Sequence, residues 1–164
     1  MKQKKVCMLG AAAVGKTSLV ARYVRSIFSE KYHSTIGVKI DKKTVQHGDK
    51  AVNLILWDIY GEDQFQQVQT SYLRGASGYL LVADGTRPDT LDTALVLRGR
   101  VHDSVGDLPF RLLINKSDLT DQWALSEAVL EPLREQGWQI IRTSAKTGEG
   151  VEKAFVSLTE EMLS

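Results

Sequence analysis

The amino-acid sequence predicts a single α/β domain, spanning 1–164, with a mostly parallel six-stranded sheet and helices on both of its faces. Two observations indicate this fold class. Continuously apolar runs, which are typical of strands buried on both faces, alternate with segments of helical period along the whole chain. Neither a repeat nor a linker-like change of composition interrupts this pattern, and 164 residues are enough for one core of ordinary size.

Six apolar or alternating runs predict the strands of the sheet. They are VCMLG (6–10), VKIDKKTVQ (38–46), AVNLILWD (51–58), GYLLVAD (78–84), FRLLIN (110–115) and WQIIRTSA (138–145). The second run alternates like a strand exposed on one side, and HGDK then turns the chain into the third run, which predicts a hairpin. The basic residues of MKQKK, before the first run, are interpreted as a solvated tail.

Apolar residues at helical spacing predict the helices between the strands. The expected helices cover 15–28, 88–103 and 149–163. Leu19, Tyr23 and Ile27 recur at intervals of four in the first helix, as residues on one helical face do. The segment 123–137 also has a helical period, but Pro132 should kink it or divide it in two, because proline lacks a backbone N–H.

Composition and charge narrow the class of function. The chain has 21 basic and 20 acidic residues and a net charge of +1, so no broad positive field favours nucleic acid as a partner. No stretch approaches the roughly 18 apolar residues of a membrane span. The single cysteine, Cys7, excludes an intramolecular disulfide and indicates a reducing, cytoplasmic compartment, where we expect it to be a small buried strand residue.

A glycine-rich loop follows the first predicted strand and precedes the first helix. It reads GAAAVGKTS (10–18) and matches G-x-x-x-x-G-K-[ST], a loop whose backbone N–H groups and helix N-terminus point at phosphates. Lys16 can reach the β- and γ-phosphates, and the Thr17 hydroxyl can ligate Mg²⁺. The residues assigned to the phosphates are Gly10, Ala13, Val14, Gly15, Lys16, Thr17 and Ser18. The motif predicts a P-loop NTPase; the alternative is a chance glycine turn before a helix.

Two polar loops after later strands predict the bound base. INKSD (114–118) offers Asn115, Lys116 and Asp118; the Asp118 carboxylate can accept hydrogen bonds from the ring N–H and amine of guanine, a donor pair that adenine lacks. TSAKTG (143–148) can donate backbone N–H groups to the guanine carbonyl oxygen. Its assigned residues are Ser144, Ala145 and Lys146. Either loop alone could be an ordinary polar turn, but both in this order predict guanine binding.

Together these motifs resemble those of the Ras-superfamily small GTPases, with the Rab branch nearest in pattern, over essentially the whole chain. The stretches that carry the resemblance are GAAAVGKTS, YHSTIGV, WDIYGED, NKSD and TSAK. The resemblance implies a small G domain that binds GTP and GDP with Mg²⁺ and acts as a molecular switch. It also implies that protein effectors and regulators bind through switch I, about 28–38, and switch II, about 59–74.

The resemblance assigns roles that periodicity does not identify. Phe28 should pack against the guanine, and Tyr32 should lie near the phosphates. Thr35 should ligate Mg²⁺ and sense the γ-phosphate, Asp58 should hold Mg²⁺ through water, and Gly61 should offer its N–H to the γ-phosphate. The implied metal set is Thr17, Thr35 and Asp58.

The stretch WDIYGED departs from the family's usual W-D-T-A-G-Q-E at Ile59, Tyr60 and Glu62. Glutamate in place of the catalytic glutamine keeps an oxygen that can accept a proton from water but lacks the amide donor. Phosphate oxygens at about 4–6 Å would oppose its charge by roughly 3–4 kcal/mol at an effective dielectric of about 20. Tyr60 must point away from the γ-phosphate or crowd switch II. We therefore expect slow hydrolysis, with Glu62, Lys16 and Gly61 as the catalytic residues.

Alternatives stay open at this point. A prokaryotic member of the family could use another water-positioning group, for which Gln64, Gln66 and Gln67 are candidates. A chain with negligible hydrolysis would be a GTP-binding interaction or dimerisation module, whereas an ATPase or nucleoside kinase is disfavoured by NKSD. In the phosphate loop, Ala12 and Ala13 add methyl groups that could obstruct an arginine supplied by a partner.

Two further features concern partners. Rab-type proteins carry a C-terminal cysteine tail for prenylation, but this sequence ends at EEMLS, so we expect no direct membrane anchor in this chain. A larger polypeptide and a nucleotide-dependent dimer are the other expectations. Lys39, Lys42 and Lys43 follow switch I on the exposed strand and form either a solvated face or part of an effector surface.

Overall fold

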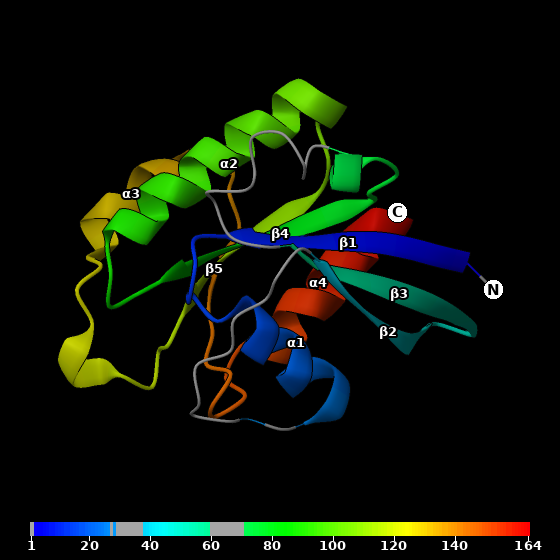
Figure 1. Cartoon of the computed structure of the whole chain (residues 1–164), viewed down its shortest axis with the longest axis horizontal. Helices are drawn as coiled ribbons and strands as arrows, with labels where there is room; N and C mark the ends of the chain where they lie inside the picture. The colour runs from blue at the N-terminus through cyan, green and yellow to red at the C-terminus, as the bar shows by residue number, and fades with distance from the viewer. Residues whose placement is uncertain (1, 27, 29–37, 60–70) are drawn as a thin grey trace.

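The computed structural model describes residues 2–26, 28, 38–59 and 71–164, and Figure 1 shows a central sheet between helices. Six strands form the sheet in the order β2-β3-β1-β4-β5-β6. Their bounds are β1 Lys2–Gly10, β2 Val38–His47, β3 Lys50–Ile59, β4 Gly78–Asp84, β5 Phe110–Asn115 and β6 Ile140–Arg142. β2 is antiparallel to β3, and the other neighbouring strands are parallel. The predicted mostly parallel six-stranded sheet is confirmed.

Helices cover both faces of this sheet, as predicted. They are α1 Lys16–Arg25, α2 Asp89–Val105, α3 Glu127–Glu135 and α4 Val151–Leu163, with the short 3₁₀ turns η2 Ser71–Leu73 and η3 Thr120–Gln122. In Figure 1, α1 and α4 lie on one face, and α2 and α3 lie on the other. Each face buries its own apolar cluster, with Leu19 and Leu158 in the first and Leu97 and Leu130 in the second. Among the described helices, none is long and apolar enough to cross a membrane.

Helix α1 packs against the last helix of the chain. The rings of Tyr23 and Phe155 are stacked with centroids 4.0 Å apart, which joins α1 to α4. The helix ends at Arg25 rather than at the predicted residue 28, because Ser26 adopts a left-handed φ of 56° and donates its N–H to the Arg22 carbonyl oxygen at 3.0 Å. Ile27, which was expected to continue the apolar face, lies outside the described residues.

The N-terminal residues belong to the sheet, so the prediction of a solvated tail is wrong. Lys2 to Lys5 pair with Val52 to Ile55 of β3 in parallel register. The Lys5 ammonium lies 3.7 Å from the centroid of the Trp57 ring, which adds a cation–π contact between β1 and β3. Apolar periodicity missed this extension because backbone pairing, rather than side-chain burial, holds it in the sheet.

Pro132 lies inside α3 and does not divide it in two, so that part of the prediction is wrong, while a kink at Pro132 stays a prediction. Pro132 is the sixth residue of α3, beyond the first four N–H groups that have no intrahelical acceptor, so the proline removes the one bond that its own N–H would make to the Ala128 carbonyl oxygen. Leu130, which is 1% exposed, and the partly buried Leu133 pack into the cluster that α3 shares with α2. This packing offsets the single lost hydrogen bond and keeps one continuous helix.

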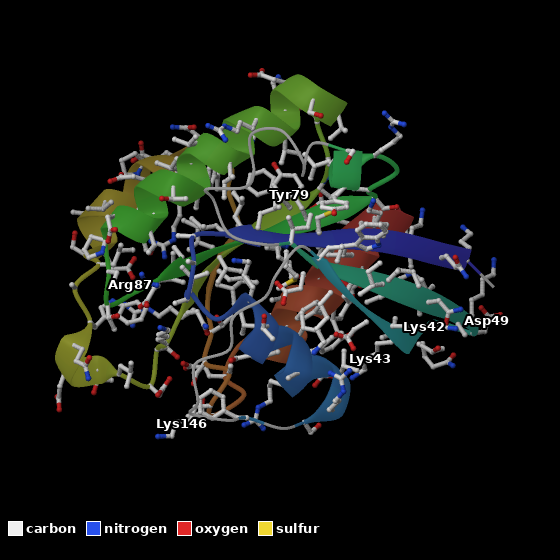
Figure 2. All side chains as sticks on the ribbon, in the orientation of Figure 1. Lys42, Lys43, Asp49, Tyr79, Arg87 and Lys146 are labelled. Atoms are coloured by element: carbon white, nitrogen blue, oxygen red, sulfur yellow. The ribbon has the colours of Figure 1, made fainter. Side chains whose placement is uncertain are left out.

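The predicted hairpin is confirmed, because His47 pairs with Lys50 across a turn in which Gly48 has a φ of 65°. Figure 2 shows Lys42, Lys43 and Asp49 on this hairpin. Lys42 is exposed, but the Lys43 ammonium donates to the Tyr23 carbonyl oxygen at 2.7 Å and lies 4.1 Å from the centroid of its ring. The lysines of β2 are therefore not a uniformly solvated face.

Candidate nucleotide-binding site

The carboxyl ends of the parallel strands meet at one edge of the sheet, where ligands bind in open α/β folds. The residues at or beside these ends are Gly10, Asp58, Asp84 and Asn115. Asp84 and Asn115 are register partners on β4 and β5. Polar groups from distant parts of the sequence are therefore brought together beside the glycine-rich loop.

The loop between β1 and α1 has a backbone that requires small residues. A Cβ atom on Gly10 would lie 2.4 Å from the Val82 carbonyl oxygen, and one on Gly15 would lie 2.2 Å from Asn115 Nδ2. Gly15 has a φ of 105°, which side chains rarely permit. Ala13 also has a positive φ, 63°, at a cost of order 1 kcal/mol for a residue other than glycine. Such local strain is typical of a backbone arranged around a ligand.

Lys16, the first residue of α1, is 7% exposed and points its side chain back over the loop. Its ammonium donates to the carbonyl oxygens of Gly10 at 3.0 Å and Ala11 at 3.1 Å. A buried ammonium has lost much of its hydration, so an anion entering the loop would interact with it strongly. The predicted phosphate-binding lysine is therefore held where the loop closes.

Thr17 and Asp58 come together from α1 and β3. The Thr17 hydroxyl donates to Asp58 Oδ2 at 2.5 Å, and Asp58 is 1% exposed. Hydroxyl and carboxylate oxygens are the ligands that Mg²⁺ prefers, so this pair fits the predicted metal site. Thr35, the third predicted ligand, lies outside the described residues.

Asn115 and Lys116, predicted to serve the base, hold the phosphate loop. The Asn115 amide donates to the Val14 carbonyl oxygen at 2.9 Å, and its own oxygen accepts a hydrogen bond from the Thr143 hydroxyl at 3.0 Å. The Lys116 ammonium donates to the Ala13 carbonyl oxygen at 3.0 Å. These contacts join the loop after β5 to the phosphate loop, so one element positions both parts of the site.

Asp118 is oriented by the loop that follows β6. The Ser144 hydroxyl donates to Asp118 Oδ1 at 2.7 Å and accepts a hydrogen bond from the Thr147 N–H at 3.0 Å. Ser144 is fully buried, so its hydroxyl is a fixed support for the carboxylate. The loop starts earlier than predicted, because β6 ends at Arg142 rather than at 145. The two predicted base-reading loops are therefore in direct contact.

Arg22 is a site residue that the sequence interpretation missed. Its Nε donates to the Ala145 carbonyl oxygen at 2.7 Å, and its Nη2 donates to the Lys146 carbonyl oxygen. Arg22 lies on α1, only a few residues beyond Lys16, so the helix that follows the phosphate loop also holds the base-reading loop. Helical periodicity marks Arg22 as a polar residue but gives no sign of a partner 123 positions away.

Asp84 is a second missed residue, although its place at the end of an apolar strand was a usable signal. The side chain is 1% exposed and forms ion pairs with Lys116 at 2.9 Å and Arg87 at 3.0 Å. Burial raises the pKa of Asp84, but hydrogen bonds from Thr86, Lys116 and Arg87 outweigh it and leave this pKa below its ordinary value. Asp84 is therefore a carboxylate that stays ionised beside the phosphate loop.

Other predicted site residues lie outside the described residues. These are Tyr32, Thr35, Gly61 and Glu62, together with Tyr60, Gln64, Gln66 and Gln67. Of the remaining predicted residues, Phe28 is 36% exposed and Ser18 is half-buried in the first turn of α1. Their contacts with a nucleotide stay predictions.

Comparison with known proteins agrees with the fold and with the resemblance of the sequence motifs. A model of the Ras family matches residues 5–164. The Ras-related protein Rab-10 of Diplobatis ommata is 34% identical over 161 residues, which cover 97% of this chain and 80% of that protein. The Ras-related protein Rab-8B of Homo sapiens is 32% identical over 162 residues, which cover 98% of this chain and 78% of that protein. The chain therefore belongs to the Ras family, as a Rab-like small GTPase.

Proposed function

We propose that the chain is a guanine-nucleotide switch that binds GTP and GDP with Mg²⁺ and hydrolyses GTP slowly. The observation that carries the proposal is the Asp118 carboxylate, which Ser144 holds at the same sheet edge as the phosphate loop. A carboxylate there discriminates guanine, while Lys16 and the helix N-terminus favour phosphate. Family membership supports the same function in general terms.

The proposed reaction is attack of water on the γ-phosphorus of GTP, with cleavage of the bond to the β–γ bridging oxygen, which leaves with GDP. Lys16 would neutralise charge on the phosphate oxygens, and Thr17 with Asp58 would hold Mg²⁺. The bound metal would supply electrostatic stabilisation of the developing charge. Glu62 would accept a proton from the attacking water, without the amide donor that glutamine would provide.

A single-turnover series at position 62 tests hydrolysis. We expect wild type to be slow and Glu62→Gln to be about tenfold faster, because the amide restores a donor and removes a charge repelled by the phosphates. Glu62→Ala should fall to or below the wild-type rate. Rates are measured by quenching preformed protein–GTP complexes and resolving GDP. Equal, near-zero rates in all three proteins with GTP still bound would contradict the enzyme and support the alternative, a GTP-binding interaction or dimerisation module.

Removal of Mg²⁺ tests the Thr17 and Asp58 assignment. A chelator should raise the dissociation rate of fluorescent GDP by about one to two orders of magnitude, because the metal links the phosphates to both side chains. Thr17→Ala should release fluorescent GDP quickly without chelator, and adding the chelator should change its release rate little. Thr93→Ala, which removes a surface hydroxyl from α2, is the matched control and should behave like wild type. Chelator-insensitive release from wild type would refute the metal site.

We further propose a cytoplasmic location and protein effectors that recognise the switch segments 28–38 and 59–74. The single cysteine supports a reducing compartment, because a chain with one cysteine forms no intramolecular disulfide. Most of the two switch segments lies outside the described residues. Affinity capture with the GTP-loaded and the GDP-loaded protein identifies partners that bind these segments in one nucleotide state. A partner retained equally by both states would not be a switch effector.

A further inference from the structure

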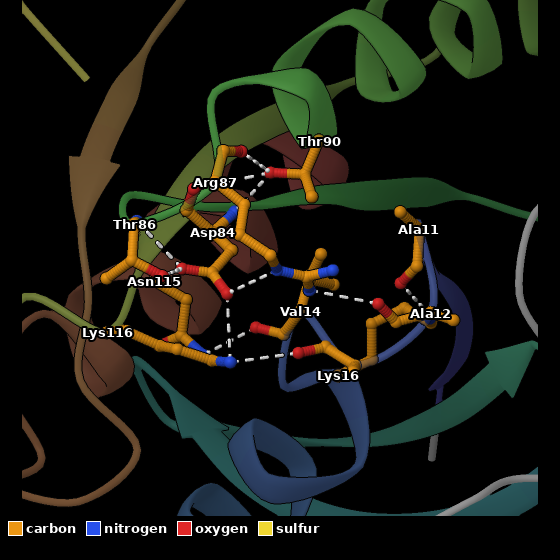
Figure 3. A network of polar contacts seen from close by, with 11 residues as sticks. Ala11, Ala12, Val14, Lys16, Asp84, Thr86, Arg87, Thr90, Asn115 and Lys116 are labelled. Carbon is orange, nitrogen blue, oxygen red and sulfur yellow. Dashed lines mark hydrogen bonds and ion pairs between the residues drawn. The ribbon is translucent and has the colours of Figure 1, made fainter. Parts of the chain in front are cut away.

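Three consecutive carbonyl groups of the phosphate loop are held by side chains from outside it. Arg87 Nη2 donates to the Ala12 carbonyl oxygen at 3.0 Å. Lys116 Nζ and Asn115 Nδ2 donate to the next two carbonyl oxygens along the loop, at 3.0 and 2.9 Å. Figure 3 shows these contacts converging on the loop from the ends of β4 and β5. The loop motif itself contains none of the three donors.

Holding these carbonyls also orients the N–H groups that follow them. In a trans peptide the C=O and the next N–H point in opposite directions, and the described residues contain no cis bond. Fixing the Ala12 carbonyl outward therefore turns the Ala13 N–H to the other side of the loop. A run of N–H groups on one side forms a concave site for an anion.

Asp84 supports the arginine that holds the first of these carbonyls. Its Oδ2 accepts Arg87 Nε at 3.0 Å and lies 2.9 Å from Lys116 Nζ, while its Oδ1 accepts both the N–H and the hydroxyl of Thr86, at 2.8 and 2.6 Å. The Thr90 hydroxyl donates to the Arg87 carbonyl oxygen at 2.7 Å, which fixes the turn that carries the arginine. The guanidinium is thus held by its own turn and by a buried carboxylate.

The guanidinium suits this position because it donates in two directions at once. One nitrogen binds Asp84 and another binds Ala12, so two separate nitrogens of one rigid group reach the two acceptors, whereas an ammonium would have to reach both from a single nitrogen. The same carboxylate also holds Lys116, which belongs to the base-reading loop. A side chain on β4 therefore connects the phosphate loop to the loop that carries Asp118.

We propose that Arg87 is a positioning residue of the nucleotide site, which fixes the Ala12–Ala13 peptide so that its N–H faces the bound phosphates. This inference rests on the proposed guanine-nucleotide function. Arg87 acts through the backbone and does not itself contact the nucleotide. Its loss lets the peptide rotate and leaves the Ala12 carbonyl without its charged donor, so the phosphates are bound less tightly while the base contacts stay in place.

The test compares Arg87→Ala, Arg87→Lys and a control, Arg134→Ala, which removes an arginine paired with glutamates on the surface of α3. We expect Arg87→Ala to raise the dissociation rate of fluorescent GDP by about fivefold to twentyfold. The substitution removes one charge-assisted hydrogen bond, whose strength is reduced because Arg87 is partly exposed to solvent. The ³¹P resonances of bound GDP should also shift, which a merely structural role would not cause. Arg87→Lys should be intermediate, and Arg134→Ala should match wild type.

The outcomes separate the two proposals. A wild-type protein that binds no guanine nucleotide would overturn the proposed function, and this inference with it. Wild-type dissociation rates and ³¹P shifts in Arg87→Ala would overturn the inference alone. If Arg87→Ala does not fold, Arg87→Met decides the matter, because methionine keeps most of the apolar stem but has neither of the two donors. A wild-type rate and spectrum in that variant would likewise exclude a positioning role.

Discussion

Asp118→Asn should switch the base preference of the protein from guanine to xanthine. Guanine presents two donors to the carboxylate, whereas xanthine has a carbonyl oxygen in place of the amine. Asparagine offers one acceptor and one donor, which matches xanthine and leaves a guanine donor facing an N–H group. We expect GDP to bind about 100- to 1,000-fold more weakly, because a site built on hydrogen bonds rejects a ligand that leaves them unpaired.

Competition titrations with GDP, xanthosine diphosphate and ADP measure this switch. Asp121→Asn is the matched control, since it makes the same change at an exposed aspartate in the turn η3. Asp118→Ala should lose guanine preference without gaining xanthine, because alanine offers neither donor nor acceptor. Unchanged preference for guanine in both Asp118 variants would refute the role assigned to this carboxylate.

Lys16→Ala should weaken GDP binding by about 100- to 1,000-fold. The Lys16 residue is 7% exposed, and its ammonium is held beside the loop by the Gly10 and Ala11 carbonyl oxygens. Charges that meet in a partly desolvated site attract more strongly than they do in water. The substitution removes this attraction and leaves two carbonyl groups without their donor.

Isothermal titration and the nucleotide-dependent rise in melting temperature measure the loss, because a ligand that binds the native state stabilises it by an amount that grows with the logarithm of the ligand concentration divided by Kd. Lys153→Ala, at an exposed position of α4, is the control for removing a lysine charge. A change of less than threefold in Lys16→Ala would contradict the place of this lysine in phosphate binding. Heating both variants without nucleotide separates a binding defect from a folding defect.

The order of strands and helices could be predicted because each apolar run carries its own local signal. The glycine-rich loop was equally visible, since close backbone approach at Gly10 and Gly15 requires residues without a side chain. Asp118 was assigned to the guanine base because the chemistry of a carboxylate at that place favours one base, and this role stays a prediction. In each case the information lies within a few consecutive residues of the sequence.

Features that depend on distant partners could not be predicted in the same way. Asn115 and Lys116 hold carbonyl oxygens about 100 positions earlier in the chain, and Arg87 holds one 75 positions earlier. Arg22 likewise reads in the sequence as an ordinary polar residue of a helix, because its partner, the Ala145 carbonyl oxygen, lies 123 positions later in the chain. These contacts are set by sheet order, which brings separate strand ends together.

Helix α1 couples the two loops of the candidate nucleotide-binding site. It begins at Lys16, the proposed phosphate-binding lysine, and Arg22 on the same helix holds the Ala145 carbonyl oxygen in the proposed base-reading loop. A nucleotide that contacts both loops would therefore be bound at two places that α1 connects. If loosening the Arg22 contact weakens nucleotide binding, a bound nucleotide strengthens that contact by the same coupling free energy, because linkage is reciprocal. A protein that displaced α1 could therefore expel the nucleotide without touching it.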